Sequence, residues 1–555
     1  MVWLPTCHSR CHLLRDTAGV FDATKDHQCA QGLSLRDRVP VGQLTEAPML
    51  RLYPFLVPLP FLLAACGEDQ LSNPSTSTSN NTESVSAAAA LVVNSLADPG
   101  DGTCNTRECT LREAIKDSRS SAITFAAGLA GSSIILARPG AGGGTLVIDK
   151  TLSITGPSGH VTITRRNADP EFRLMTIGDG GRASLANLSL RNGRTNRNGG
   201  GIINFGSLTL RNCIIADNRA FTGGGIDNHG PLTLTGTVVE HNAASSFGVG
   251  GIHNHLRRVS IARSSVGNNS GEGIFNGGGS LEITNSTITD NSGGGLGQDW
   301  GGTTLDHVRI LGNSGGGMSN HQGEVLLTNS VVALNHGDLG AGITNSAGGR
   351  IRIVSSTISN NSASESGGGI HNTVGDPFGR LSAHIEILNS TISGNSAQVG
   401  GGIENSDRLG GAGVTVMNST IARNTATREG GGVRNGESID EDNPNGVFLL
   451  NTIVALNSAP TAPDAADADA RFSLIGNGTG SGISNSNGNQ VGTGSSPINP
   501  RIGPLVNNGG PTRTHALLAG SPAIDAASTP DCPATDQRGV ARPRGAGCDM
   551  GSYEK

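Results

Sequence analysis

Short runs of alternating apolar and polar residues recur along the middle of the chain. Examples are SLTLR at 207–211, SLEIT at 280–284 and HIEIL at 384–388. Alternation with a period of two predicts a β-strand, because successive side chains of a strand point to opposite faces. The runs are too short for helices, and Gly or Asn separates them. We therefore expect many short strands joined by tight turns.

The strands belong to a repeat marked by the tetrad Gly-apolar-x-Asn, whose copies follow one another at intervals of 22 to 33 residues. One copy, GLGQ, carries Gln298 where the others carry Asn. After each tetrad come an alternating stretch, a second apolar pair and a further Asn. The tetrad asparagines are Asn204, Asn228, Asn254, Asn276, Asn320, Asn345, Asn372, Asn405 and Asn435.

Stacking is the way in which such a repeat can bury its apolar positions, since one unit cannot do so alone. The pattern predicts an all-β fold, a single-stranded right-handed parallel β-helix with three short strands per coil. About ten coils are regular, and residues 134–190 read as less regular first coils. At the corners, Asn tolerates left-handed backbone angles and can hydrogen-bond to the Asn above and below as a ladder.

The N-terminal region resembles a bacterial lipoprotein precursor. From Met49 one Arg precedes an apolar run that ends in Leu63-Ala64-Ala65-Cys66. This tetrapeptide is similar to a lipobox, in which the cysteine is lipidated, whereas a plain secretory signal with a chance cysteine is the alternative. The resemblance implies a signal peptide at 49–65, and Gly67 after the cysteine favours the outer membrane.

The flanks of this signal carry two further expectations. Residues 1–48 do not fit a leader and are interpreted as an upstream extension from a mis-assigned start codon. Residues 66–90 are rich in Ser, Thr and Asn without an apolar period, so we expect a flexible tether.

Both ends of the folded part resemble bacterial β-helix proteins with a CSLREA-type N-terminal region and a choice-of-anchor C-terminal region. The first resemblance rests on CTLREAI at 109–115 and implies a cap at 91–133, before a β-helix at 134–460. The second rests on GPLVNNGGPTRTHALLAGSPAID at 503–525 and DQRGVARPRGAGCDMGSYE at 536–554, within a region at 461–555.

The same resemblance suggests how the cysteines pair. Cys104 with Cys109, and Cys532 with Cys548, would form disulfides in an oxidising compartment, with four free thiols as the alternative. Cys213 stands alone in a strand and is expected to be a small core residue.

Composition narrows the function classes. The 84 glycines, 3% aromatic and 15% charged residues are atypical of an ordinary globular enzyme. The formal charge of −6 is mild, and with no basic stripe a nucleic-acid partner is not expected. We expect a monomer that needs no cofactor.

Catalysis by a β-helix would require ionisable groups at matching positions of neighbouring coils. The position before the tetrad Asn does not form an acidic column, so a catalytic role is not favoured and no catalytic residue is assigned. In chain order this position carries Ile203, Asp227, His253, Phe275, Gly297, Ser319, Thr344, His371, Glu404 and Arg434.

The best local candidate for a metal or acid–base site is Asp227-x-His229 over His253-x-His255. One Asp and three His could hold Zn²⁺, but a polar solvent face is the simpler interpretation, and no metal is assigned. Glu404 beside Arg434 is interpreted as an ordinary surface ion pair.

Trp300 follows the irregular tetrad and could be a stacking platform for a sugar, although capping of an irregular corner is favoured. Exposed aromatics are otherwise few. The sequence therefore favours a non-catalytic lipoprotein of the cell envelope or surface, facing the periplasm or the exterior. It would act in adhesion or interaction, with the membrane bound through the lipid and a glycan or surface protein as partner. A polysaccharide lyase or glycoside hydrolase acting on an extracellular glycan is the alternative.

Overall fold

The computed structural model describes residues 90–117, 119, 121–140, 142–245, 248–375, 381–406, 411–436 and 446–555. The predicted extension, signal peptide, lipidation site Cys66 and all but the last residue of the tether lie outside these described residues. The chain divides into two units, Met1–Glu83 and Ser84–Lys555, and the description below concerns the second.

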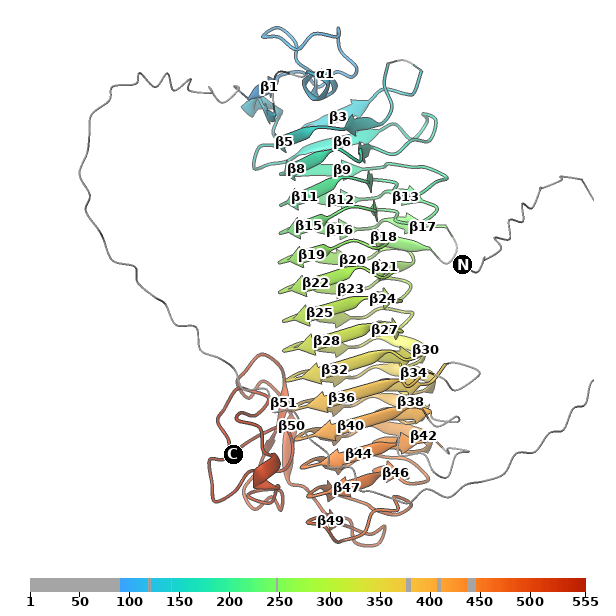
Figure 1. Ribbon diagram of the computed structural model, residues 1–555, viewed down its shortest axis with the longest axis vertical. Coiled ribbons are helices and arrows are strands. Elements are labelled where there is room, and N and C mark those ends of the chain that lie inside the picture. Colours follow the sequence, from blue (N-terminus) through green and yellow to red (C-terminus); the bar gives the residue numbers. More distant parts are fainter. Residues whose placement is uncertain are drawn as a thin grey trace, which may run out of the picture. The chain divides into compact units, whose positions relative to one another are not determined.

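The folded unit is a rod of stacked coils, a parallel β-helix of the right-handed type (Figure 1). Each regular coil contributes one strand to each of three parallel sheets, named here sheets A, B and C. Along the chain the order is sheet C, sheet A, sheet B, and then the next coil. The predicted fold class, with three short strands per coil, is confirmed.

Sheet A has 15 strands. They are β1 (Leu91–Val93), β2 (Ala122–Phe125), β5 (Thr151–Thr155), β8 (Arg182–Ala186), β11 (Ser207–Arg211), β15 (Leu232–Thr235), β19 (Val259–Ala262), β22 (Ser280–Thr284), β25 (Gly302–Asp306), β28 (Glu324–Thr328), β32 (Arg350–Val354), β36 (His384–Leu388), β40 (Gly413–Met417), β44 (Val447–Leu450) and β47 (Asp469–Arg471).

Sheet B also has 15 strands. They are β3 (Ser133–Leu136), β6 (Val161–Arg165), β9 (Leu188–Arg191), β12 (Ile214–Ala216), β16 (Val238–Glu240), β20 (Ser265–Gly267), β23 (Thr287–Thr289), β26 (Arg309–Leu311), β29 (Val331–Ala333), β33 (Thr357–Ser359), β37 (Thr391–Ser393), β41 (Thr420–Ala422), β45 (Ile453–Ala455), β48 (Leu474–Ile475) and β49 (Gln490–Val491).

Sheet C has 13 strands and carries the tetrads. They are β4 (Leu146–Ile148), β7 (Met175–Ile177), β10 (Ile202–Asn204), β14 (Ile226–Asn228), β18 (Val249–Asn254), β21 (Glu272–Asn276), β24 (Leu296–Gln298), β27 (Met318–His321), β31 (Ile343–Ser346), β35 (Ile370–Thr373), β39 (Ile403–Ser406), β43 (Val433–Asn435) and β46 (Ala465–Ala466).

Short strands also pair where the chain turns from sheet B to sheet C, and a hairpin lies near the C-terminus. The turn strands are β13 (Arg219–Ala220) with β17 (Ala243–Ala244), and the row β30 (His336–Leu339), β34 (Ser362–Ser366), β38 (Ser396–Val399) and β42 (Thr425–Glu429). The hairpin consists of β50 (Ile502–Val506) and β51 (Thr514–Leu517), and the helices are α1 (Leu111–Lys116), η1 (Ala127–Leu129) and η2 (Thr529–Asp531). Among the described residues, no helix is both long and apolar enough to cross a bilayer.

The core is a continuous column of Ile, Leu and Val inside the coils. Alternate residues of each strand point inward, and equivalent residues stack in register, as in Leu208, Leu232 and Val259 of sheet A. The core runs from Val93 to Ile475, so the paired strands extend past the predicted limits 134–460 at both ends.

The tetrad asparagines form a buried ladder at the corner between sheets C and A. Asn204 donates from Nδ2 to Oδ1 of Asn228 at 2.7 Å, and the pattern continues to Asn276. It resumes at Gln298, whose Nε2 donates to Oδ1 of Asn320 at 3.3 Å, and ends at Asn435. Each such bond between buried amides contributes about 1 kcal/mol.

Two further polar ladders line the other corners. After sheet B, Asn242 uses both its backbone N–H and its Nδ2 to bond Oδ1 of Asn269, and neighbouring coils repeat this arrangement. Between sheets A and B, the backbone N–H of each Ser or Thr donates to the hydroxyl of the next, as in Ser330 and Ser356. The triangular rod therefore has a polar spine at each edge.

The ladder asparagines do not use the left-handed backbone angles that Asn tolerates. Those angles occur at the corner between sheets A and B, for example at Asn285, Asn389 and Asn418, the first residues of Asn-Ser-Thr triplets. A ladder side chain must point inward from an extended strand, whereas the left-handed residue makes the turn before the next strand. The two tasks fall to different residues.

The N-terminal cap is built by the CTLREAI motif. Thr110 and Glu113 form a capping box at the start of α1, and Arg112 forms a buried ion pair with Asp98 at 2.6 Å. A disulfide joins Cys104 to Cys109. The motif residues thus have structural roles at the open end of the core.

The C-terminal residues fold back along the rod instead of extending it. The hairpin β50–β51 and the chain end lie beside the lower coils (Figure 1). His515 contacts Ser393 at 2.9 Å, and Ser552 contacts Thr391 at 2.9 Å. The disulfide between Cys532 and Cys548 lies in this segment, whose core packs on Ile453.

Candidate functional site

Asp227 and three histidines come together on the outer side of sheet C. Asp227 in β14 pairs in register with His253 in β18. His229 and His255 each follow the ladder asparagine of the same coils, so alternation brings them to the same side as Asp227 and His253.

All three imidazoles contact the one carboxylate. Oδ2 of Asp227 lies 2.8 Å from Nε2 of His229. Oδ1 lies 3.1 Å from Nδ1 of His253 and 3.0 Å from Nε2 of His255. An ionised carboxylate only accepts hydrogen bonds, so each of these ring nitrogens is the donor.

The environment of Asp227 keeps its carboxyl group ionised. Burial alone would raise its pKa, but the hydrogen bonds from His253, His255 and His229 outweigh burial and hold the pKa well below its usual value. The side chain of Asp227 is 0% exposed. The sequence interpretation of these residues as a polar solvent face is therefore wrong for Asp227, because the imidazoles above it exclude water.

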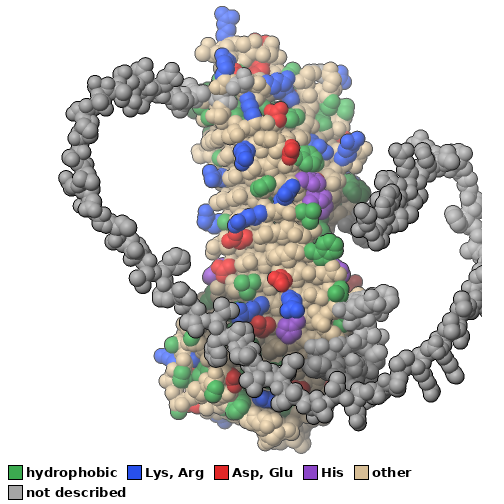
Figure 2. Space-filling view, viewed as in Figure 1, with side chains coloured by type: hydrophobic (Ala, Val, Ile, Leu, Met, Phe, Trp, Pro, Cys, Tyr) green, Lys and Arg blue, Asp and Glu red, His purple; other side chains and the backbone are tan. Residues whose placement is uncertain are grey.

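Ring stacking fixes the orientation of the imidazoles. The ring of His229 stacks on that of His255 with centroids 3.8 Å apart, and Phe205 stacks on the other face of His229 at 5.1 Å. Phe275 lies against His253 at 5.6 Å. A group of histidine side chains is visible at the surface in the upper half of the rod (Figure 2).

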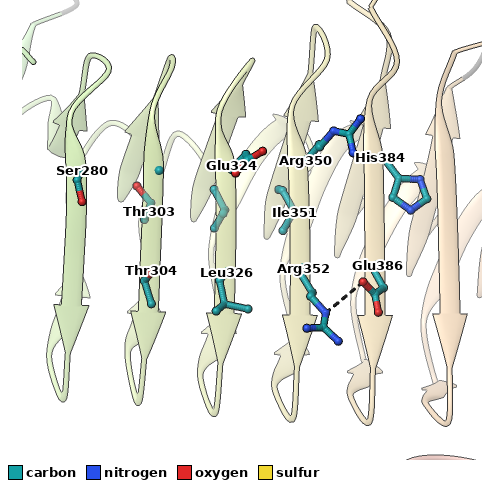
Figure 3. Close-up of a pocket in the computed structure, with 12 residues that line it drawn as sticks. Ser280, Thr303, Thr304, Glu324, Leu326, Arg350, Ile351, Arg352, His384 and Glu386 are labelled. Atoms are coloured by element: carbon teal, nitrogen blue, oxygen red, sulfur yellow. Dashed lines mark ion pairs between the residues drawn. The ribbon is translucent and has the colours of Figure 1, made fainter. Parts of the chain in front are cut away.

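A shallow groove of about 470 Å³ runs across the outer face of sheet A. It crosses five consecutive strands, from β22 to β36, so that it lies along the rod axis (Figure 3). Its floor is the strand backbone with outward side chains such as Thr304 and Leu326. Charged residues occupy one end, namely Glu324, Arg350, Arg352, His384 and Glu386.

Of the two arginines in this groove, one is paired with a carboxylate of the described residues and the other is not. Arg352 forms an ion pair with Glu386 at 3.1 Å, whereas within the described residues Arg350 forms no ion pair. Burial and the neighbouring Arg350 lower the pKa of His384, so that its ring is neutral at neutral pH. Among the described groove residues, the unpaired guanidinium of Arg350 therefore lies beside a neutral imidazole, and the carboxylate of Glu324 occupies the equivalent position of the neighbouring strand β28.

Glu404 and Arg434 do form a contact, but not the surface ion pair that the sequence suggested. Their atoms are 2.7 Å apart, and the side chain of Glu404 is 1% exposed. Arg434 also pairs with Glu429 at 2.8 Å, from the turn strand β42. Burial raises the pKa of Glu404 despite the nearby guanidinium. The turn strands cover this position, and sequence spacing does not reveal that cover.

Trp300 is exposed at the corner after β24, with its side chain available to solvent. Its indole N–H donates to Oε1 of Gln322 in the next coil. Both a stacking platform and a corner cap agree with this position.

Glu272 is an ionisable residue that the sequence analysis missed. Burial, together with the charge of Asp299, raises the pKa of Glu272 to about 7. Its carboxyl group packs over Gly297 of the next tetrad, and the ring of Phe275 from its own strand borders the same glycine. The other tetrads carry a side chain at the position of Gly297. This glycine was the sequence feature that could have indicated room for the carboxyl group of Glu272.

Figure 2 shows acidic and basic side chains interspersed on the visible side of the rod, with no field of one sign. No family model matches the chain, and no curated protein matches it. Among solved structures it is similar to the pectate lyase Pel9A, with 14% identity over 84% of this chain and 97% of that chain, at a TM-score of 0.35. That likeness concerns the fold and carries no argument about activity.

Proposed function

We propose that the protein is a non-catalytic interaction scaffold of the bacterial cell envelope, anchored through lipid on Cys66, whose rod binds an extended polysaccharide. The observation that carries the proposal is the groove along sheet A. It is open, it follows the rod axis, and successive coils line it at intervals of about 4.8 Å. An extended polymer fits such a surface, whereas a small ligand would need a more enclosed cavity.

The charges indicate the class of polymer. The unpaired guanidinium of Arg350 suits a carboxylate, to which it can donate two hydrogen bonds. His384 beside it is neutral and can donate or accept a hydrogen bond. We therefore propose a carboxylate-bearing polysaccharide, bound without aromatic stacking and hence with modest affinity.

Binding of the purified mature chain to polygalacturonate and to neutral dextran tests this proposal. We expect binding to polygalacturonate alone, weakened on the order of 10-fold by Arg350→Ala. Arg182→Ala is the matched control, since Arg182 occupies the same outward column of sheet A outside the groove. Equal binding by wild type and Arg350→Ala would contradict the proposal.

The groove also supports a second candidate, a polysaccharide lyase or glycoside hydrolase. Neutral His384 beside Arg350 places a possible base next to a cation, and Glu324 lies in the same groove. Incubation with the bound polymer separates the two functions. New unsaturated or reducing ends that disappear in His384→Ala would favour the enzyme over the scaffold.

A further inference from the structure

Three ligand atoms of different residues converge at the Asp227 cluster. One carboxylate oxygen of Asp227 and one ring nitrogen each of His229 and His255 lie within 4.8 Å of one another. We propose that Asp227, His229 and His255 bind a late transition-metal ion such as Zn²⁺ on the side of the rod. This inference is independent of the proposed glycan groove.

The spacing of the ligand atoms is close to what a tetrahedral ion requires. Metal–ligand bonds of 2.0–2.1 Å place neighbouring ligand atoms about 3.3 Å apart. Nε2 of His229 lies 2.8 Å from Oδ2 of Asp227, and Nε2 of His255 lies 3.0 Å from Oδ1, the other carboxylate oxygen. Binding of one ion therefore requires the two stacked rings to rotate toward a common point, and the ion takes the place of the Nε2 protons, which move to Nδ1.

The donor set selects the kind of metal. Ca²⁺ and Mg²⁺ need several oxygen ligands, whereas imidazole with one carboxylate suits Zn²⁺, Cu²⁺ or Ni²⁺.

His253 has a different role, as a positioning residue. Its Nδ1 donates to Oδ1 of Asp227 at 3.1 Å. This bond orients the carboxylate so that Oδ2 faces His229. Such partners of a metal ligand raise affinity without touching the ion.

The fourth coordination position faces solvent. The side chains of His229 and His255 are 31% and 32% exposed, while Asp227 is fully buried behind them. Three protein ligands with one open position are typical of zinc sites that also bind water or an external ligand, whereas structural sites have four protein ligands.

The test is the metal content of the mature chain, prepared without a histidine tag and dialysed against Zn²⁺ and then metal-free buffer. We expect about one zinc ion per chain, as a single three-ligand site requires. The variant His229→Ala/His255→Ala should retain none, and His253→Ala should bind zinc roughly 10- to 100-fold more weakly. Circular dichroism establishes that each variant keeps its β-structure.

His321→Ala is the matched control. His321 follows a ladder asparagine in the same way as His229 and His255, but its ring contacts Ser346 at 3.2 Å and forms no ion pair with a carboxylate of the described residues. Zinc content should be unchanged in this variant. Wild-type zinc no higher than in the double variant, or an equal loss in His321→Ala, would overturn the proposal and leave a hydrogen-bonded histidine network.

Discussion

The side-chain amide of Gln537 donates a hydrogen bond of 3.0 Å to the hydroxyl of Thr357, a residue 180 positions earlier in the chain. Its carbonyl oxygen accepts a bond of 2.6 Å from Thr391 in the next coil. Gln537 is buried, and both of its polar atoms are satisfied by the rod and by its own segment. One side chain therefore bridges two coils of sheet B and joins the C-terminal segment to them.

Gln537→Ala should weaken this attachment. The substitution removes the bonds of Gln537 to Thr357 and Thr391, at a cost of about 1 kcal/mol each in the free energy of unfolding. The two hydroxyl groups keep their contacts with Arg513 and Ser552. Limited proteolysis should then cut first within residues 500–555. Gln322→Ala, which changes an exposed glutamine, is the control. Equal protease resistance of the two variants would mean that other contacts hold the segment.

Gln298 and Thr303 should behave as a compensated pair. Gln298 interrupts the asparagine ladder, and Thr303 donates its hydroxyl to Oε1 of Gln298. Thr303 occupies an inward position where the adjacent coils carry Leu281 and Val325. The buried hydroxyl of Thr303 thus provides a hydrogen bond to the side-chain amide of Gln298, which is longer than that of Asn.

A double-mutant cycle tests this coupling. Thr303→Val alone should cost roughly 1–3 kcal/mol, because it leaves the glutamine oxygen unpaired. Gln298→Asn/Thr303→Val restores the repeat and should stabilise the rod by about 1 kcal/mol through a continuous ladder. Asn254→Gln, which introduces the irregularity elsewhere, should destabilise it. If the effects of Gln298→Asn and Thr303→Val on the free energy of unfolding were additive, the two residues would not be coupled.

Glu272 should make stability depend on pH. Its folded-state pKa is about 7, against an ordinary value of 4.5. The folded protein therefore holds a proton that the unfolded chain has lost between these pH values. The free energy of unfolding should fall as pH rises from about 4.5 to 7, by on the order of 1–3 kcal/mol.

Urea unfolding of wild type and Glu272→Gln at pH 5 and pH 8 measures this contribution. The variant stays neutral throughout and should lose less stability between the two pH values. Glu282→Gln is a suitable control, since Glu282 lies at the surface of β22 in a weak ion pair with Arg258 at 3.5 Å. Parallel pH profiles for wild type and Glu272→Gln would show that Glu272 is not the titrating group.

Cys213 should be unreactive while the rod is folded. The thiol is buried, and burial raises its pKa to about 11. Alkylation requires the thiolate, so labelling at pH 8 should be roughly 100-fold slower than in the unfolded chain. Mass spectrometry of the peptide that contains Cys213, with and without denaturant, gives the two rates. Rapid labelling in the native protein would show that these coils open locally.

The fold was predictable because every coil repeats the same physical solution. The phased tetrads identify the inward apolar positions, and the interval between copies gives the length of a coil. The same phasing places Asp227 beside His253, a relationship that the register bears out. Sequence spacing is sufficient wherever the contact is between equivalent positions of adjacent coils.

Other features of the site depend on which residues cover a given position, and the spacing of the sequence repeat does not indicate this. The burial of Asp227 beneath three imidazoles, and of Glu404 beneath β42, follows from side chains and strands outside the tetrad. The groove on sheet A likewise arises from which outward residues are small in β22 and β25. The Ser/Thr ladder was visible as Asn-Ser-Thr triplets, but its hydrogen bonds require the coils to be stacked.

The covered face of sheet B also left a faint signal in the sequence. The outward residues of β33, β37 and β41 are Thr, Ser or Ala, and all are buried, whereas those of β23 are half-buried. Small hydroxyl-bearing side chains let another segment approach closely. The pattern does not say which segment covers the face.

Because the C-terminal segment returns along the rod, it affects the order in which parts of the chain can fold. A chain that emerges N-terminus first can wind its coils one after another, each on the edge of the last. The coils of β33, β37 and β41 are then complete well before their cover has been made, because Gln537 and Ser552 come more than 100 residues later. We therefore expect this cover to form after the coils that it contacts, and a chain that ends before Gln537 to carry these coils with one bare polar face.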